Sequence, residues 1–168
     1  KTIPILLQTV DLTMYPEGGD LISGVENRVY YEAFTPAKKP ADLEGIVVDG
    51  DGKQVARFRS EHEGRGRFAF TPEEGEKYSL KITKPSSINT TYPLPEAKAD
   101  GVAMIAQHNL FDDSIELTLA SPQEKDVTVT LTKREKLSSQ QETLFLASKP
   151  KLVKLPAGDI NGTLIATV

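Results

Sequence analysis

Residues 44–61 read EGIVVDGDGKQVARFRSE, two alternating runs joined by the turn DGDG at residues 49–52. Asp-Gly steps supply the positive φ angles that a tight antiparallel turn needs. Along the second run, Phe58 falls on one face while Arg57 and Arg59 fall on the other. Because successive strand residues point to opposite faces, this stretch predicts a β-hairpin with one buried side and one solvent-facing side.

Short alternating runs of the same kind continue on both sides of this hairpin. They are rich in Val, Ile, Thr, Tyr and Phe and are bounded by Gly, Pro, Asp and Asn, which is typical of strands. The first half predicts strands at residues 5–15, 28–35, 44–49, 53–61, 67–71 and 77–83. The second half predicts strands at residues 102–108, 114–120, 126–133, 142–147, 151–155 and 163–168. The run between the third and fourth of these, at residues 133–142, is polar all round and predicts a long loop.

The chain has a composition break near its middle. Proline, serine and threonine dominate residues 84–94, which is typical of a boundary between domains. Many short strands at regular spacing favour an antiparallel β-sandwich. We therefore expect an all-β chain of two consecutive antiparallel β-sandwich domains, residues 1–84 and 95–168, joined by a linker at residues 85–94.

The composition excludes several classes of protein. The 168 residues are 38% hydrophobic and 26% charged, with a formal net charge of -4, so a folded chain without a basic footprint for nucleic acid is expected. No apolar run is long enough to span a membrane as a helix. Cysteine is absent, which excludes disulfides, thiolate catalysis and a thioester within this sequence. The chain starts at Lys1 without an initiator Met, so we interpret it as a piece of a larger protein.

Few residues suggest chemistry. His62 lies between two glutamates, but neighbouring strand residues point to opposite faces and cannot converge on one ion. His108 lies in a polar stretch, where loop polarity explains it as well as a metal role does. The DGDG turn lacks the glycine and glutamate that a calcium loop needs at later positions. No nucleophile, phosphate-loop or dinucleotide motif occurs. We expect no enzyme activity, no metal and no cofactor.

One charge cluster stands out near the hairpin. It consists of the four arginines Arg57, Arg59, Arg65 and Arg67. If the two strands that carry them pair, all four can lie on the outer face. They are then either a solvated face balanced by Glu61 and Glu63, or a docking surface for a neighbouring domain, because arginine is favoured at interfaces.

The first half also carries an ordered set of short motifs. The stretch YPEGGDLISG at residues 15–24, followed by NRVYYEA at residues 27–33, resembles a segment of bacterial alpha-macroglobulin-like proteins. The resemblance extends over about residues 10–105. It continues through GIVVD at 45–49, GKQVA at 52–56, HEGRGRF at 62–68, TP at 71–72 and YPLPEA at 92–97. Beyond that point only the rhythm of the strands fits.

This resemblance implies a chain of macroglobulin-like, immunoglobulin-like sandwich domains from a large extracytoplasmic protein of the periplasm, cell surface or medium. In members of the family that trap proteases, a bait region is cleaved and a thioester captures the protease; the motifs for neither are present here. The implied function is that of a non-catalytic structural fragment, contributing to protease inhibition where the parent carries a bait region. Its partners are then neighbouring domains and proteases. The alternative is a cell-surface or adhesin-like module that binds protein or carbohydrate, which the lack of Trp weakens.

Overall fold

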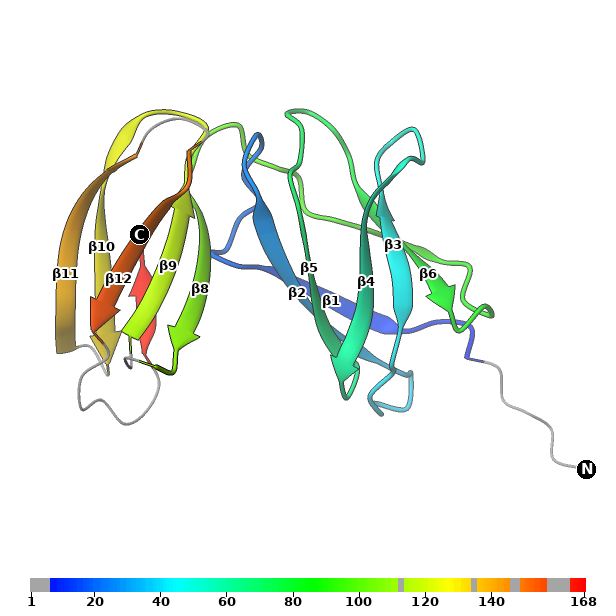
Figure 1. Cartoon of the computed structure of the whole chain (residues 1–168). Coiled ribbons are helices and arrows are strands. Elements are labelled where there is room, and N and C mark those ends of the chain that lie inside the picture. Colours follow the sequence, from blue (N-terminus) through cyan, green and yellow to red (C-terminus); the bar gives the residue numbers. More distant parts are fainter. Residues whose placement is uncertain (1–6, 112–113, 134–135, 146–148, 157–163) are drawn as a thin grey trace, which may run out of the picture.

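The computed structural model describes residues 7–111, 114–133, 136–145, 149–156 and 164–168. Within these ranges the chain is all-β, its strands pair antiparallel, and no helix is present. In particular, none of the described segments forms a helix long and apolar enough to cross a bilayer. The strands gather in two groups (Figure 1), which we call the first region, residues 7–98, and the second region, residues 101–168.

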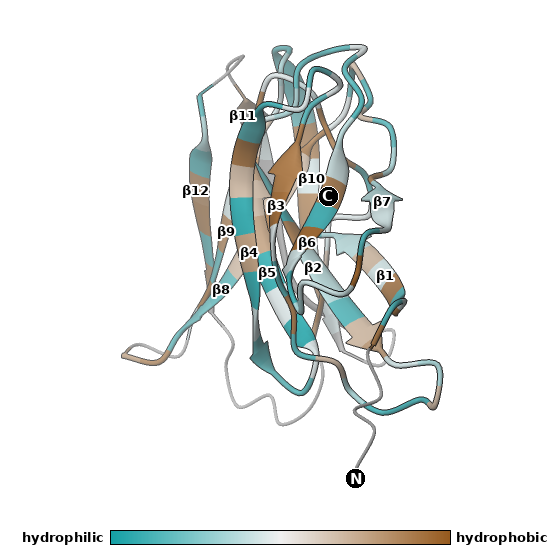
Figure 2. Cartoon of the chain, turned by 90° about the vertical axis from the view of Figure 1, so that its right-hand side faces the viewer, coloured by the Kyte–Doolittle hydropathy of each residue, from teal (hydrophilic) through white to brown (hydrophobic). Residues whose placement is uncertain are grey.

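The first region holds a single chain of paired strands. Its strands are β1 (Asp11–Pro16), β2 (Asn27–Phe34), β3 (Glu44–Val48), β4 (Gln54–His62), β5 (Arg65–Phe70), β6 (Ser79–Lys84) and β7 (Thr91–Pro93). They pair in the order β1-β2-β5-β4-β3-β6-β7. The predicted hairpin is confirmed, since β3 pairs with β4 and Ile46 lies opposite Arg57. Strand β3 is more hydrophobic than its neighbours β4 and β6 (Figure 2).

The strands of the first region share one hydrophobic core. The strands β4 and β5 pair only at Ser60–Gly66 and His62–Arg65, so they diverge beyond these residues. The ring of Tyr31 on β2 meets that of Phe58 on β4 at 5.2 Å between centroids. Because β2 and β4 both flank β5, this contact spans a single strand. Val29 on β2 and Leu80 on β6, which are far apart in the pairing order, belong to the same core. The largest side chains of this core are Tyr31, Phe58, Phe68, Phe70 and Tyr78.

Two predictions for the first region need correction. The first strand begins at Asp11, and residues 7–10 are not in a strand; residues 5–6 lie outside the described ranges. The segment expected as a linker contains β7, which pairs with β6 and places Tyr92 opposite Leu80. Ile88 and Leu94 of the same segment are buried in the core of the first region. Prolines are tolerated here because β7 is an edge strand, which needs hydrogen-bond donors on one side only.

The second region holds two sheets of three strands. Its strands are β8 (Ala103–Asn109), β9 (Ser114–Ala120), β10 (Lys125–Lys133), β11 (Lys136–Phe145), β12 (Lys151–Pro156) and β13 (Ile165–Thr167). One sheet has the order β11-β10-β13 and the other β12-β9-β8. Leucine and valine from both sheets form a single buried cluster around Phe145. The strands predicted at 102–108, 114–120, 126–133 and 151–155 are confirmed to within a residue or two.

The predicted loop at residues 133–142 is wrong. Residues 136–145 form β11, the longest strand, which pairs with β10 over most of its length. Strand β11 is at the edge of its sheet. A hairpin with β10 satisfies the backbone of this polar run, and an edge strand needs less apolar sequence than a central one.

Candidate functional site

The first candidates are the residues that suggested chemistry in the sequence. The described residues contain no group of three or more side chains that could hold a metal ion. In the DGDG turn, the Asp49 carboxylate accepts a hydrogen bond from the Lys53 amide at 2.8 Å, so it fixes the turn. His62 is exposed, and its Nε2 lies 3.8 Å from a Glu63 carboxylate oxygen. His108 lies on β8, opposite Ile115. These positions point to turns and surfaces, so the remaining candidates are interaction surfaces.

The four arginines lie on two diverging strands. Arg57 and Arg59 are on β4, Arg65 and Arg67 are on β5, and all four are exposed. They line two adjoining hollows that share Glu61 and Arg67. The larger hollow has a volume of about 540 Å³ and is also lined by Arg57 and Arg59. The smaller hollow has a volume of about 440 Å³ and is also lined by Arg65.

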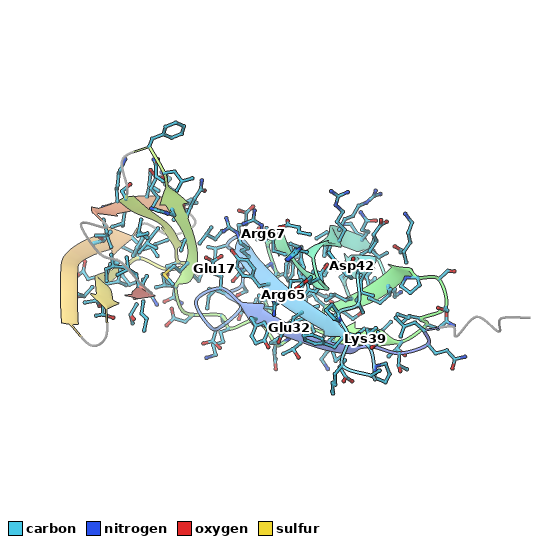
Figure 3. The ribbon with its side chains drawn as sticks, turned by 90° about the horizontal axis from the view of Figure 1, so that it is seen from below. Glu17, Glu32, Lys39, Asp42, Arg65 and Arg67 are labelled. Atoms are coloured by element: carbon cyan, nitrogen blue, oxygen red, sulfur yellow. The ribbon has the colours of Figure 1, made fainter. Side chains whose placement is uncertain are left out.

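The acidic partners of these arginines differ in part from those expected. The Arg67 Nε lies 3.7 Å from Glu61, as the sequence suggested. Glu63 instead lies beside His62, and the Arg65 Nε lies 3.7 Å from Glu32 on β2. Figure 3 shows Glu32 and Arg65 near each other on this part of the first region. The direct cross-strand pairing of Glu32 with Arg65 accounts for this contact.

Two tyrosines that the sequence did not single out complete the smaller hollow. Tyr15 on β1 lies directly opposite Tyr30 on β2, with 48% and 38% of their surfaces exposed. The Tyr15 hydroxyl donates a hydrogen bond of 2.7 Å to Glu32, which raises the pKa of Tyr15. Tyr30 in turn lies opposite Arg67 on β5, and a hydrogen bond with Tyr30 raises the pKa of Arg67. We call this smaller hollow the tyrosine–arginine hollow; its lining residues are Tyr15, Tyr30, Tyr31, Glu32, Glu61, His62, Arg65, Gly66 and Arg67.

Sequence reasoning could place Tyr30 and Glu32 on the outer face of their strand, but it could not find Tyr15. The alternation along β2 assigns its outer residues directly. The contact between Tyr15 and Tyr30 depends on the register of β1 against β2, which no local pattern reports. The available signal was therefore Tyr30 alone, on the same face of β2 as Glu32.

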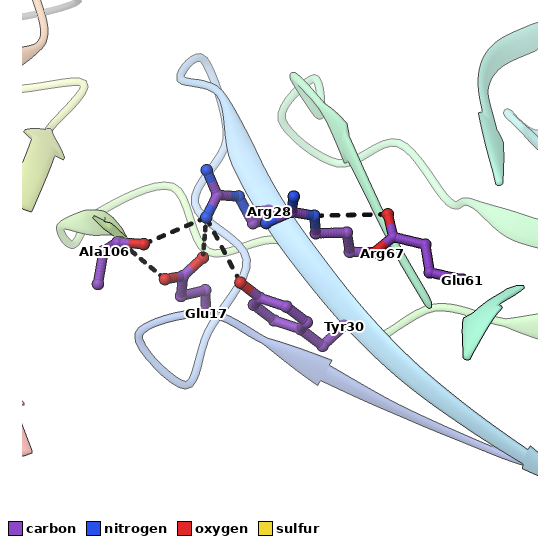
Figure 4. Close-up of polar contacts among 6 residues, drawn as sticks. All are labelled: Glu17, Arg28, Tyr30, Glu61, Arg67 and Ala106. Carbon is purple, nitrogen blue, oxygen red and sulfur yellow. Dashed lines mark hydrogen bonds and ion pairs between the residues drawn. The ribbon is translucent and has the colours of Figure 1, made fainter. Parts of the chain in front are cut away.

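The second candidate is the junction between the two regions. Glu17 and Arg28 of the first region both contact one residue of the second, Ala106 on β8 (Figure 4). The Ala106 amide donates a hydrogen bond of 2.7 Å to Glu17 Oε1, and its carbonyl accepts one of 3.3 Å from Arg28 Nη1. The other oxygen of Glu17 lies 3.5 Å from Arg28, and these side chains are only 13% and 19% exposed. The Glu17 carboxylate and the Arg28 guanidinium thus make the hydrogen bonds to β8 that a neighbouring strand would otherwise make.

Apolar contacts extend this junction. Ile22 and Val25 of the first region form a buried cluster with Ala103 and Ala120 of the second. Within the first region, the Lys98 amide donates to the Leu21 carbonyl at 2.8 Å and the Ser23 amide donates to the Lys98 carbonyl at 2.9 Å, which fixes the end of that region beside the cluster. A cavity of about 230 Å³ lies beside the cluster, lined by residues of both regions.

The loop of the PEGGDL motif reaches the same surface. A Cβ on Gly18 would lie 3.5 Å from the Cβ of Met104 on β8. Gly18 and Gly19 have φ angles of 89° and 99°, which glycine adopts without strain. The motif that carries the family resemblance therefore forms the turn that contacts the second region.

No protein-family model matches this sequence, and no curated protein matches it. The resemblance to alpha-macroglobulin-like proteins therefore stays a prediction that depends on the motifs quoted from residues 10–105.

Proposed function

We propose that this chain is a non-catalytic structural part of a large extracytoplasmic bacterial alpha-macroglobulin-like protein. In this proposal the two regions are consecutive β-sandwich domains that hold a fixed angle within a longer array. The observation that carries the proposal is the contact of Glu17 and Arg28 with both main-chain polar groups of Ala106. Such a contact fixes orientation as well as distance, because hydrogen bonds to the two peptide groups that flank one residue restrict rotation between the regions.

Burial supports the fixed angle. Both charged side chains of the contact are largely removed from water. Glu17 Oε1 accepts a hydrogen bond from Ala106, whereas the buried Glu17 Oε2 has no hydrogen-bond partner among the described residues and is balanced by its ion pair with Arg28. The apolar cluster of Ile22, Val25, Ala103 and Ala120 adds contact area next to it. A flexible connection would expose these apolar side chains, so the arrangement favours a rigid spacer.

The sandwich interpretation is supported by how the strands share their cores. In the first region, Val29 on β2 and Leu80 on β6, which are far apart in the pairing order, share one core. In the second region, Phe145 packs with residues of both three-stranded sheets. In the parent protein, neighbouring domains are then the first partners. Contribution to protease inhibition depends on a bait region elsewhere in the parent, with proteases as further partners.

Residual dipolar couplings of the backbone amides test the fixed angle. The intact chain is expected to fit one alignment tensor for both regions. The double variant Glu17→Ala, Arg28→Ala is expected to need two tensors, because the polar contact with β8 is lost. A matched control is Asp11→Ala, Lys38→Ala, which removes an exposed ion pair at the opposite end of β1 from the junction. Separate tensors for the unmodified chain would contradict the proposal.

The role in protease inhibition has its own test. The parent protein is incubated with proteases of several classes, and cleavage is followed together with the compactness of the molecule. Cleavage at a defined segment followed by compaction supports a protease trap. A parent that survives intact, or that is degraded without compaction, contradicts that role and leaves the structural one.

A second candidate function, a surface binding module, is favoured by one specific observation. The tyrosine–arginine hollow presents two exposed rings beside two guanidinium groups on the outer face of the sheet. Tyrosine and arginine are the residue types most enriched at binding sites.

A further inference from the structure

We infer that the open side of β4 binds an extended acidic segment of a partner protein, one with carboxylates at two alternate positions. The segment adds an antiparallel strand beside β4, and its carboxylates pair with Arg57 and Arg59. The site lies at the larger hollow and includes no residue of the junction between the two regions.

Strand β4 has a partner on one side only over most of its length. It pairs with β3 from Gln54 to Arg59, whereas its pairing with β5 is confined to Ser60 and His62. The strands β4 and β5 meet near their turn and separate away from it (Figure 1). On the side away from β3, residues 54–58 therefore have no partner strand in the described part of the chain. Extended peptides commonly bind a sheet at an edge of this kind.

The main chain of Arg57 faces this open side. The Ser60 amide donates to the Leu43 carbonyl at 2.8 Å, so the main chain of Ser60 points toward β3. Because main-chain polar groups alternate in direction along a strand, those of Arg57 and Arg59 point away from β3. The Arg59 carbonyl oxygen agrees with this direction, since it lies 2.5 Å from where a Cβ on Gly66 of β5 would be. An added strand can thus exchange hydrogen bonds with Arg57.

The acidic side chains at the larger hollow already have partners. Its lining contains two glutamates, Glu44 and Glu61. Glu44 Oε2 lies 2.8 Å from Lys84 Nζ, and Glu61 Oε1 lies 3.7 Å from Arg67 Nε (Figure 4). Neither glutamate forms an ion pair with Arg57 or Arg59. The two ion pairs therefore leave the arginines of β4 uncompensated.

The outer face of β4, β3 and β6 consequently has an excess of positive charge. In the described ranges, three exposed cations of this face have no ion-pair partner, namely Arg57, Arg59 and Lys81. Lys81 belongs to the same row as Arg57, because Ile46 lies opposite both of them. The chain as a whole carries a net charge of -4, so this face is a local exception. An acidic partner is complementary to it.

The spacing of the two arginines fixes the spacing of the carboxylates. Arg57 and Arg59 lie on one face of β4, with the buried Phe58 between them on the other. Residues directly opposite each other in an antiparallel pair point to the same face. Carboxylates at two alternate positions of the added strand therefore lie beside the two guanidinium groups. Each guanidinium has a planar fork of donors that matches a carboxylate.

The open main chain favours a peptide over a small anion or an acidic sugar. Only a ligand with amide and carbonyl groups at strand spacing can pair with the edge of β4 as well as with its arginines. The edge strand β8 differs in this respect, because Glu17 and Arg28 occupy the amide and the carbonyl of Ala106. No such side chain is bonded to the main chain of Arg57 within the described residues.

The test is a titration of the full chain, followed through its backbone amide chemical shifts, with the peptide acetyl-SVEVES-amide as the probe. Saturable shifts at Arg57 and Arg59 are expected. Two controls, SVQVQS without the charges and SVEEVS with glutamates on opposite faces, are expected to bind at least about tenfold more weakly, since each loses a charge-assisted contact. No saturable binding of SVEVES overturns the inference. Equally tight binding of SVEEVS also overturns it, because charge alone would then explain the affinity.

Methylation of the probe's amides separates strand addition from charge attraction. In the antiparallel arrangement the glutamate amides face β4, whereas the valine amide between them faces away. N-methylation of the glutamates is expected to weaken binding about tenfold or more, because it removes main-chain hydrogen bonds and places methyl groups in the interface. N-methylation of that valine is expected to change affinity less than about threefold. Equal effects of the two modifications overturn the pairing with β4.

Matched arginine variants locate the site. Arg57→Gln and Arg59→Gln are each expected to weaken binding of SVEVES about tenfold or more, the effect of losing a charge-assisted hydrogen bond. Arg65→Gln is the control, because Arg65 is exposed, is paired with Glu32 and lines only the smaller hollow. It is expected to change affinity less than about twofold, as for a screened charge. Equal losses for Arg65→Gln overturn the site. The dipolar-coupling measurement of the junction is unaffected by any of these outcomes.

Discussion

The two regions of the molecule bury different kinds of side chain. In the first region, five aromatic rings form a continuous series, Tyr31, Phe58, Phe68, Phe70 and Tyr78, with centroids 5.0–6.0 Å apart. In the second region, the buried cluster is leucine and valine with a single ring, Phe145. Aromatic pairs have preferred geometries, whereas aliphatic packing is less directional. The first core therefore depends more on a few large residues than the second does.

The largest expected effect that sharpens this comparison is the loss of one ring. Phe68→Ala is expected to lower the free energy of unfolding by about 3–5 kcal/mol, because it leaves a cavity between two neighbouring rings. Denaturant unfolding measures it. Val55→Ala on the exposed face of β4 is the control and should change stability by less than about 0.5 kcal/mol. A loss below about 1 kcal/mol for Phe68→Ala would show that the ring series is not what holds the first region.

The next effect distinguishes the two glycines of the turn between the regions. Gly19→Val is expected to cost about 1–2 kcal/mol, because its φ of 99° is strained for a branched residue. Gly18→Val should cost more, since its side chain also meets Met104 of the second region. Thermal unfolding of both variants, with Gly19→Asn as a better-tolerated control, gives the order. Equal losses of stability for Gly18→Val and Gly19→Val would mean that a side chain at position 18 does not contact β8.

Buried hydroxyls give a smaller effect that should differ in sign between the regions. The Tyr31 hydroxyl lies 3.3 Å from Ser60 Oγ, and Tyr31→Phe is expected to cost about 0.5–1.5 kcal/mol. Burial raises the pKa of this phenol. Thr143 Oγ1 in the second region is buried without a hydrogen-bond partner among the described residues. Thr143→Val should therefore leave stability unchanged or raise it slightly, and a clear loss in denaturant unfolding would contradict this.

The smallest effect concerns an ion pair at the start of the second region. A hydrogen bond from Lys125 holds the pKa of Asp100 below its ordinary value of about 3.9. A depressed pKa means that the ionised form is favoured in the folded chain. The contribution to stability is therefore present above the ordinary pKa and is lost as the pH falls through the lowered one. A carboxyl-carbon titration should show the shift, and Lys125→Gln should remove it; an unchanged Asp100 in that variant would contradict the assignment.

Local patterns predicted the strands that pair with neighbours in sequence. The hairpin of β3 and β4 follows from DGDG and from the alternation around Phe58, because both signals lie within one stretch. Strand β7 was missed because its prolines indicate a linker, yet an edge position tolerates them. The strand predicted at residues 142–147 overlaps only the end of β11, and residues 136–141 were missed because their sequence is polar, although a hairpin satisfies their backbone.

For the candidate sites, too, local sequence patterns place single residues but not the contacts between distant ones. The four arginines could be placed on outer faces from the alternation of β4 and β5. Their grouping with Tyr15, and the contact of Glu17 with Ala106, join residues that are far apart in sequence. Such contacts depend on register and on the docking of two regions, which a single sequence does not report.

The contact of Glu17 and Arg28 with Ala106 has a consequence for how copies of the protein behave toward one another. Strand β8 is at the edge of its sheet and would otherwise present unpaired main-chain groups to any passing chain. With the amide and the carbonyl of Ala106 occupied, a foreign strand cannot pair at the middle of β8 without first displacing a carboxylate and a guanidinium. Glu17 and Arg28, which orient the two regions, thus also protect the edge strand β8 from edge-to-edge aggregation.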